Sequence, residues 1–402
     1  MASDISCGRP VSVVGFTDKN TIYIEEDALK GILLADNVKN LPAVVISIAG
    51  AYRTGKSFLL NFLLRYLHGG CKADGLGEPN DPLVGFEWSR GYKAVTKGIM
   101  MWNKVFEVTK PSGEKVAVIL MDTQGAFDSG STNEEMVAFF TIAAVLSSVN
   151  VYNVLRQIQE DHIERLVFFN EYARLANKEI SGKSFQKLLF LVRDWNSPNE
   201  TPYGVIGGEK MLQKWLHNTE GKPEEVQELH NEFSSAFESV ECFLMPHPGM
   251  QLIKKKTFNG CISDLDNDFV NELKDLVDLL LAPRNLLVKT TNGKPITCHE
   301  LFQYFQVYAK MFRDGTLPTP LSLHEAHANL NHAKALQNAR KDYNNYMFKW
   351  FEEKRKPFKQ STMDATHKIA LGRALLLFEE ATNIGTSKLT AEYRDKLIKE
   401  GD

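Results

Sequence analysis

The feature that most constrains the fold of this chain is a strand, a loop and a helix near its N-terminus. An apolar run at residues 43–49 leads into the pattern G-x-x-x-x-G-K-S at residues 50–57, and Phe58-Leu59-Leu60 then begin an apolar helix. A glycine-containing loop between a strand and a helix N-terminus is typical of sites that bind nucleotide phosphates. The alternative, an ordinary turn, is less consistent with the strand and helix that flank the pattern.

The residue types in this loop each suit phosphate binding. Gly50 and Gly55 permit backbone angles that turn several N–H groups toward one anion, and the following helix directs its positive end at the same place. Lys56 can reach the β- and γ-phosphates, and the hydroxyl of Ser57 can hold Mg²⁺. The pattern therefore predicts a nucleotide site that uses Mg²⁺.

Composition excludes several other classes of protein. The chain has 402 residues, 43% of them hydrophobic, and a net charge of −3, so it carries no overall basic field for nucleic acid. Its five cysteines are odd in number and scattered, which indicates a reduced protein without a disulfide framework. The longest apolar stretch, residues 139–155, contains several polar residues and predicts a buried helix followed by a strand or turn, not a membrane span.

Most of the chain alternates apolar strands with amphipathic helices, which predicts an α/β fold with a mostly parallel central sheet. The predicted strands are 11–14, 21–24, 43–48, 97–102, 116–121, 188–192 and 241–245. The predicted helices are 56–67, 133–147, 159–177, 210–216, 224–237, 268–281 and 301–312.

The pattern changes after residue 313. Two prolines and a glycine at 314–320 predict a linker over residues 314–322. Beyond it, helical patterns at 323–354, 361–383 and 388–399 predict an all-α three-helix bundle. We therefore expect a large domain at 1–313 and a helical middle domain at 323–402. The bundle contains His324, His327 and His332, which lack the spacing of a zinc motif and which we assign to a solvated helix face.

Two further segments supply the groups that a nucleotide hydrolase needs. The apolar strand 116–121 ends in Asp122-Thr123-Gln124-Gly125, where Asp122 suits the Mg²⁺ side and the Gly125 N–H suits the γ-phosphate. Thr96, in a loop between the two motifs, can place its hydroxyl on Mg²⁺ and its carbonyl near the attacking water. The alternatives are a plain strand-to-turn segment and a surface threonine, and Thr109 or Thr123 competes less well for the role of Thr96.

The group that selects the base is less clearly marked. The chain has no N/T-K-x-D motif at a strand end, but Arg193-Asp194 follows the apolar run 190–192. The carboxylate of Asp194 can accept the two N–H groups of guanine, and Arg193 can stack on the ring, while a surface ion pair is the alternative. Arg53 lies inside the phosphate loop, where it can act as an arginine finger in cis or simply face solvent.

Taken together, these segments resemble the atlastins, a family of dynamin-superfamily GTPases. The resemblance runs from about residue 20 to 330 and continues more weakly to the C-terminus. It rests on Gly50–Ser57, Thr96–Ile99, Asp122–Ser129, Gln159–Asp161, Phe190–Trp195, Tyr203-Gly204, Gly207-Gly208 and Cys242–Gly249. Each motif is short, but the combination is specific.

The resemblance implies a GTPase that uses Mg²⁺, forms a nucleotide-dependent homodimer and fuses membranes of the endoplasmic reticulum from their cytosolic face, with membrane segments that this chain lacks. Residues 246–260 are implied to cap the base. The implied catalytic residues are Arg53, Lys56 and Thr96, and the implied metal ligands are Ser57, Thr96 and Asp122. The implied nucleotide-binding residues are Gly50, Tyr52, Arg53, Thr54, Gly55, Lys56, Ser57, Phe58, Gln124, Gly125, Arg193 and Asp194.

Some motif variants depart from the atlastin pattern. Tyr52-Arg53-Thr54 and Thr96–Ile99 are more similar to the guanylate-binding proteins, and Val95 stands where atlastins have a second threonine. Gln124, Trp195 and the Pro-His-Pro segment favour the atlastins. Two other functions therefore stay open: a self-assembling GTPase of the guanylate-binding type, and a nucleotide-regulated membrane tether or scaffold with slow turnover.

Overall fold

A computed structural model describes most of the chain, which divides near residue 317 into two compact units. Each unit is described by itself below. The described residues are 8–17, 21–51, 54–72, 75–88, 96–125, 133–159, 162, 166, 185–217, 227, 230, 233–234, 237–255, 257–291, 293–312, 320–353, 360–382 and 387–401.

The first unit is built on a sheet of nine described strands. Their order is β2-β1-β4-β6-β3-β7-β8-β9, with β5 paired to β6. One half of the sheet is parallel and consists of β6, β3, β7, β8 and β9. The other half is antiparallel: β1 pairs with β2 and β4, and β6 pairs with β4 and β5. The strands are β1 Pro10–Phe16, β2 Ile22–Ile24, β3 Ala43–Gly50, β4 Ile99–Trp102, β5 Phe106–Thr109, β6 Lys115–Thr123, β7 Val149–Leu155, β8 Phe185–Arg193 and β9 Phe237–Leu244.

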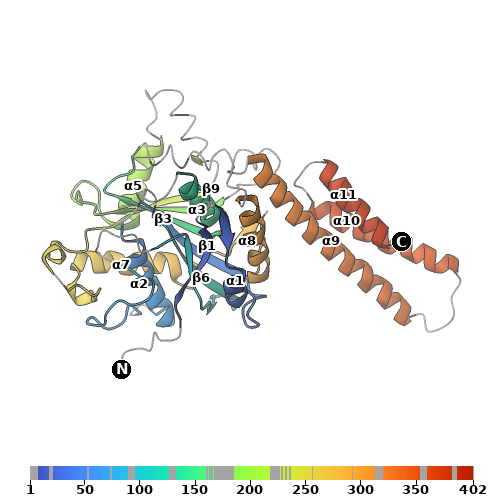
Figure 1. The fold of residues 1–402 in the computed structure, drawn as a ribbon, viewed down its shortest axis with the longest axis horizontal. Coiled ribbons are helices and arrows are strands. Elements are labelled where there is room, and N and C mark those ends of the chain that lie inside the picture. The colour runs from blue at the N-terminus through green and yellow to red at the C-terminus, as the bar shows by residue number, and fades with distance from the viewer. Residues whose placement is uncertain are drawn as a thin grey trace. The chain divides into compact units, whose positions relative to one another are not determined.

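Helices cover both faces of this sheet, as an α/β fold requires. Figure 1 shows α2 and α7 on one side and α1 and α8 on the other. Every residue of β3 is buried, because alternate side chains face the two helical layers. The helices are α1 Glu26–Leu33, α2 Lys56–His68, α3 Asn133–Leu146, α5 Gly204–His217, α7 Asn267–Leu281 and α8 Cys298–Phe312, with short 3-10 turns η2 Met250–Lys254 and η3 Ile262–Asp264 and a small pair β10 Thr290–Thr291 and β11 Lys294–Pro295.

The core between the sheet and the α2 side contains apolar side chains from β3, α2 and α7. Val44, Ile46 and Ile48 alternate along β3 and belong to one buried cluster with Leu63 of α2 and Leu276 of α7. The even-numbered residues of β3 therefore support α2, and this packing fixes the strand and the helix on either side of the glycine-rich loop.

The structure confirms the predicted α/β layout and corrects several elements. The apolar stretch after α3 is a true strand, β7, at the centre of the parallel half of the sheet. Helix α1 and strand β5 were not predicted, since each is short and α1 contains a glycine. The predicted helix 224–237 is wrong at its end, because Phe237 begins β9; the rest of it, like the predicted helix 159–177, lies mostly outside the described residues.

In the described part of the second unit there are three helices, α9 Pro320–Glu353, α10 Gln360–Ala381 and α11 Ser387–Gly401. Helix α9 includes the last three residues of the predicted linker 314–322, because proline fits the first turn of a helix, where its missing N–H has no partner to lose. The other boundaries of the predicted domains stay predictions. The buried core of this unit is small and consists of Ala335, Leu336, Ala339, Ala374, Phe378 and Leu397.

One prediction about this unit is wrong. His332 is 0% exposed, not solvated, and its Nε2 lies 2.9 Å from the Thr390 hydroxyl of α11. Its ring also contacts the rings of Phe378 and Tyr393, so the imidazole fills space that the small core leaves between the three helices. His324 and His327 lie outside the residues whose side chains the structure describes.

None of the helices in the described part of the chain is both long enough and apolar enough to cross a membrane.

Candidate functional site

The parallel strands bring four loops to one edge of the sheet. Strands β3, β6, β7 and β8 are neighbours and point the same way, so their carboxyl ends meet. Gly50, Asp122, Asn153 and Arg193 lie at or next to these ends. In open α/β sheets this is where ligands bind, and it is where the separate motifs come together.

The glycine-rich loop requires its glycines. Gly50 has a φ of +138°, and a Cβ there would lie 2.2 Å from the main-chain oxygen of Asn153. Gly55 has a φ of +78° and caps α2, with the Arg193 guanidinium 3.2 Å from where its Cβ would stand. Thr54 is buried and its hydroxyl donates to the Ala51 oxygen at 2.8 Å. Two predicted site residues, Tyr52 and Arg53, lie outside the described residues.

Lys56 is folded back onto this loop. Its Nζ donates to the Ala51 oxygen at 3.0 Å, and the side chain is buried at the first turn of α2. Burial lowers the pKa of Lys56 from 10.5 to about 8, although the nearby Asp122 carboxylate works in the opposite direction. Among the described residues of the loop, the Lys56 ammonium donates to the Ala51 oxygen, and a phosphate oxygen can replace or join that carbonyl.

Two hydroxyl groups, of Ser57 and Thr96, meet at one carboxylate oxygen of Asp122. The Ser57 hydroxyl donates to Asp122 Oδ2 at 2.5 Å, the Thr96 hydroxyl donates to the same oxygen at 2.9 Å, and the two hydroxyls lie 3.3 Å apart. Burial raises the pKa of Asp122, and the Lys56 charge and these two hydrogen bonds oppose that rise. The other oxygen, Oδ1, is buried without a hydrogen-bond partner in the described structure.

This cluster fits Mg²⁺. Mg²⁺ prefers hard oxygen ligands and is usually held in nucleotide sites by one or two carboxylates and by substrate phosphates. Ser57, Thr96 and Asp122 supply two hydroxyls and one carboxylate with an unused oxygen. Among the described residues no group of three or more His, Cys, Asp and Glu side chains is placed to hold a metal ion.

The segment that carries Thr96 is tied to the segment after Asp122. The Gly98 N–H donates to the Gln124 side-chain oxygen at 2.7 Å, and the Gln124 N–H donates to the Gly98 oxygen at 2.7 Å. Gly98 has a φ of +69°, and a Cβ there would lie 2.1 Å from the Val14 oxygen. The Thr123 hydroxyl donates to the Ile48 oxygen within the sheet, whereas the Thr96 hydroxyl donates to the Asp122 carboxylate.

The predicted base-reading residues stand at the end of β8. Arg193 is buried, donates from Nη1 to the Thr54 oxygen at 3.2 Å and lies 5.7 Å from the centre of the Phe269 ring. Burial lowers the pKa of the Arg193 guanidinium, and the Asp194 charge opposes this shift. Asp194 has a φ of +57°, which is unusual for a residue with a side chain. The guanidinium thus faces the phosphate loop, and its stacking on a base stays a prediction.

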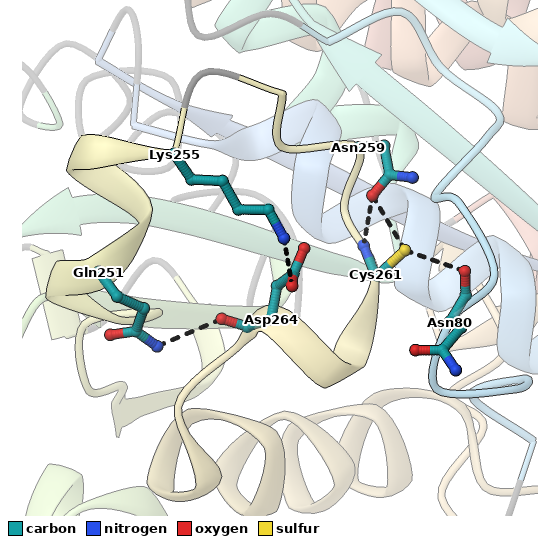
Figure 2. A network of polar contacts seen from close by, with 6 residues as sticks. All are labelled: Asn80, Gln251, Lys255, Asn259, Cys261 and Asp264. Carbon is teal, nitrogen blue, oxygen red and sulfur yellow. Dashed lines mark hydrogen bonds and ion pairs between the residues drawn. The ribbon is translucent and has the colours of Figure 1, made fainter.

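The segment predicted to cap the base is joined to residues 79–88, the described stretch that precedes Thr96. Figure 2 shows Cys261 at this junction, with its Sγ 3.0 Å from the Asn80 oxygen and 2.9 Å from the Asn259 side-chain oxygen. The Leu83 N–H donates to the Asn259 oxygen at 2.8 Å. Nothing in the sequence indicated this junction, because main-chain groups form much of it.

Three rings join the same segments to the phosphate-loop helix. Phe58, one residue after Ser57, lies with its ring 5.1 Å from that of Trp88 and 6.0 Å from that of Phe258. Trp88 and Phe258 are 5.8 Å apart. Phe58 was assigned to nucleotide binding, and the structure places its ring in this aromatic cluster.

Together the loop, its lysine and the hydroxyl–carboxylate cluster define a P-loop nucleotide hydrolase of the GTPase class. The family model for the guanylate-binding protein N-terminal domain matches residues 19–291.

Comparison with curated proteins identifies the family more specifically. The chain is 40% identical to atlastin-2 of Homo sapiens over 392 residues, and this alignment covers 97% of the chain and 67% of the relative. It is 43% identical over 376 residues to atlastin-3 of Mus musculus, covering 90% and 70%, and 38% identical over 393 residues to atlastin-1 of Bos taurus, covering 98% and 70%. The chain belongs to the atlastin family of dynamin-superfamily GTPases, and its activity is the hydrolysis of GTP.

Proposed function

We propose that the chain hydrolyses GTP with Mg²⁺ when two copies of its GTPase unit pair, and that this cycle tethers and fuses membranes of the endoplasmic reticulum. The observation that carries the enzymatic part is the convergence of Ser57 and Thr96 on one oxygen of Asp122, beside the buried Lys56. The membrane part rests on membership of the atlastin family and on the presence of a separate helical unit.

The chain's own groups have distinct tasks in this proposal. The N–H groups of the loop and the Lys56 ammonium bind the β- and γ-phosphates. Ser57, Asp122 and Thr96 hold Mg²⁺, which when bound neutralises charge that develops on the phosphates. Asp194 accepts the N–H groups of guanine. The Thr96 carbonyl and the Gly125 N–H orient the attacking water and the γ-phosphate.

Arg53 provides the proposed link between pairing and catalysis. An arginine in this loop can approach the γ-phosphate and stabilise the transition state in cis, as arginine fingers do. Pairing of two GTPase units orders this loop and the Thr96 segment. The helical unit then changes its docking, and in a membrane-anchored protein at the cytosolic face of the endoplasmic reticulum this draws two membranes together.

The enzymatic part is tested by GTP turnover as a function of protein concentration, for the wild type and for Arg53→Ala. Molecular mass is determined in parallel with GDP and with a transition-state mimic. We expect turnover per molecule to rise with concentration, dimers only in the loaded state, and collapse of turnover in Arg53→Ala. Slow turnover that is independent of concentration, from a constant monomer, contradicts the role of pairing and favours a nucleotide-regulated tether.

The membrane part needs the anchored full-length protein in vesicles. We expect vesicles to cluster and their lipids to mix only with hydrolysable GTP, and Lys56→Ala to abolish both effects. Normal GTP hydrolysis by the anchored protein without tethering or lipid mixing contradicts this part and leaves the GTPase chemistry intact.

A self-assembling GTPase of the guanylate-binding type is the second candidate. It is supported by the match of residues 19–291 to the guanylate-binding family model and by the variants at 52–54 and 96–99. The same mass measurement separates the two candidates: nucleotide-dependent assemblies larger than a dimer favour the second, and a closed dimer favours the first.

A further inference from the structure

Asn153, two residues before the end of β7, contacts both ends of the phosphate loop. Its main-chain oxygen lies against Gly50, the first residue of the loop, at a distance that leaves no room for a Cβ. Its side-chain Nδ2 donates to the Thr54 oxygen at 2.9 Å and approaches the Thr54 hydroxyl at 3.2 Å. One residue therefore spans the loop from its start to the position before Gly55.

The orientation of this amide is determined by its surroundings. The Thr54 hydroxyl donates to the Ala51 oxygen, so it has no proton left for Asn153, and the Thr54 carbonyl can only accept. Exchanging the amide nitrogen and oxygen of Asn153 would set two acceptors against each other. Nδ2 therefore faces Thr54, and Oδ1 is left buried without a hydrogen-bond partner among the described residues.

The Thr54 oxygen has a second donor in Arg193. Nη1 of Arg193 reaches it at 3.2 Å, so the ends of two adjacent strands, β7 and β8, hold the same carbonyl. A carbonyl oxygen has two lone pairs, and both are used here. The peptide between Thr54 and Gly55 is thereby fixed, and the N–H of that peptide belongs to Gly55, inside the phosphate-binding turn.

Asn153 differs from an ordinary buried polar residue in what it contacts. It is 0% exposed, and a buried amide oxygen without a partner costs free energy that a well-packed apolar side chain avoids. A residue chosen only for packing at this place needs no amide. We propose that Asn153 is a positioning residue for nucleotide binding, which holds the phosphate loop open in its binding shape through Gly50 and Thr54.

The chain contains a matched control on the same strand. Asn150 is also in β7, is 2% exposed, donates from Nδ2 to the Ser47 hydroxyl at 2.8 Å and likewise has a buried Oδ1 without a partner in the described structure. Ser47 lies in the interior of β3 and not in the phosphate loop. Replacing either asparagine removes a comparable buried hydrogen bond, but only Asn153 acts on the loop.

The test compares Asn153→Leu and Asn153→Ala with Asn150→Leu and Asn150→Ala. Leucine keeps the branching and the number of heavy atoms and removes the hydrogen bonds, and alanine serves if the larger methyl groups of leucine prevent folding. For each variant we measure thermal unfolding, the release rate of a fluorescent GDP analogue, and kcat and KM for GTP and for ITP, whose base lacks the 2-amino group. These readouts separate a general loss of stability from a loss of phosphate binding.

We expect about tenfold faster release and about tenfold higher KM in the Asn153 variants, with kcat changed less than about twofold, as for the loss of one hydrogen bond near a charged ligand. The factor is the same for GTP and ITP, because the loop contacts phosphates and not the base. The Asn150 variants lose stability but keep these constants. Equal constants for the two sets, or a loss confined to GTP, would overturn the proposal.

Discussion

On the phosphate side of the site, comprising residues 50–57, Thr96 and Asp122, side chains bond directly to one another. On the base side, comprising Arg193, Asp194 and residues 246–264, much of the contact is between main-chain groups of segments that lie far apart in the sequence. Ser57 and Thr96 share one carboxylate oxygen, whereas the base side is joined to residues 79–88 through the Leu83 N–H and the Asn80 and Pro79 oxygens.

This difference separates two kinds of requirement. Binding phosphate and Mg²⁺ demands particular chemical groups, so changing one side chain removes the chemistry. Holding a segment over a base demands mainly its backbone position, so most side chains there can change at small cost. We therefore expect substitutions on the phosphate side to abolish turnover, and substitutions on the base side to change which nucleotide is used or to have little effect.

The largest effect is expected from Lys56→Ala. This change removes the ammonium that faces the phosphate loop and leaves a cavity at the first turn of α2. We expect kcat/KM for GTP to fall by about 1,000-fold or more, as for other losses of a preorganised charge at a phosphoryl group. Steady-state phosphate release is the measurement, and unchanged thermal unfolding excludes loss of fold. Retention of a tenth of the activity would contradict the assignment of Lys56.

Asp122→Asn is expected to come next. The amide keeps the size of the side chain but removes the charge that, with Ser57 and Thr96, suits Mg²⁺. We expect turnover at a fixed low Mg²⁺ concentration to fall about 100-fold and to recover in part as Mg²⁺ is raised. Thr123→Val, at the neighbouring position, removes a bond to the Ile48 oxygen within the sheet and serves as control. An unchanged Mg²⁺ dependence in Asp122→Asn would place the metal elsewhere.

Asp194→Asn tests the base side. In the proposed function the Asp194 carboxylate accepts two N–H groups from guanine, whereas the amide of Asp194→Asn can donate to the 2-oxo group of xanthine. We expect KM for GTP to rise about 10- to 100-fold, KM for XTP to fall, and kcat to stay within a few-fold. The reason is that the wrong base leaves polar groups buried without a hydrogen bond, which weakens binding. Competition between GTP and XTP measures the preference. If GTP and XTP are affected equally, Asp194 does not read the base.

A smaller effect follows from the pKa of Lys56. Burial lowers this pKa to about 8 in the free protein, whereas a bound phosphate favours the protonated amine. The free protein thus loses the proton as pH rises through about 8, and binding must restore it. We expect nucleotide binding to take up a proton near pH 8.5 and to be about fivefold weaker at pH 9 than at pH 8. Calorimetry in two buffers of different ionisation enthalpy measures the uptake; no uptake would contradict the lowered pKa.

The smallest effect is expected at the ion pair between Lys255 and Asp264 in the base-side segment (Figure 2). The Lys255 side chain is 41% exposed, so water and salt weaken the attraction. We expect Lys255→Ala to change the free energy of unfolding by less than about 1 kcal/mol and KM for GTP by less than about twofold. A tenfold rise in KM would show that this side chain, and not the backbone alone, positions the segment.

Much of the fold could be predicted because it depends on strong local patterns. The buried strand β3, the helix α2 and the strand ending at Asp122 have long apolar runs with clear ends. The eight-residue helix α1 and the four-residue strand β5 were missed because elements so short carry little periodic signal. His332 was assigned to the surface since the wide spacing of apolar residues along α9 does not show that a polar ring fills the core.

The sequence likewise predicted part of the site. Thr96 and Asp122 stand out because their chemistry needs those residue types, and the structure brings both to Ser57. Asn153 was missed, because β7 contains a second buried asparagine, Asn150, and the sequence does not show which of the two contacts the phosphate loop. The orientation of Arg193 toward Thr54 and Phe269 could not be predicted, because both partners are distant in the sequence and no local pattern links either of them to Arg193.

The most direct test of the division between the two sides is one set of steady-state measurements, kcat and KM for GTP and XTP with the wild type, Ser57→Ala and Asp194→Asn. The account predicts that Ser57→Ala lowers turnover of both nucleotides by a similar large factor, while Asp194→Asn retains kcat and shifts the preference toward XTP. Loss of kcat in Asp194→Asn without a change of preference, or a change of preference in Ser57→Ala, would contradict it.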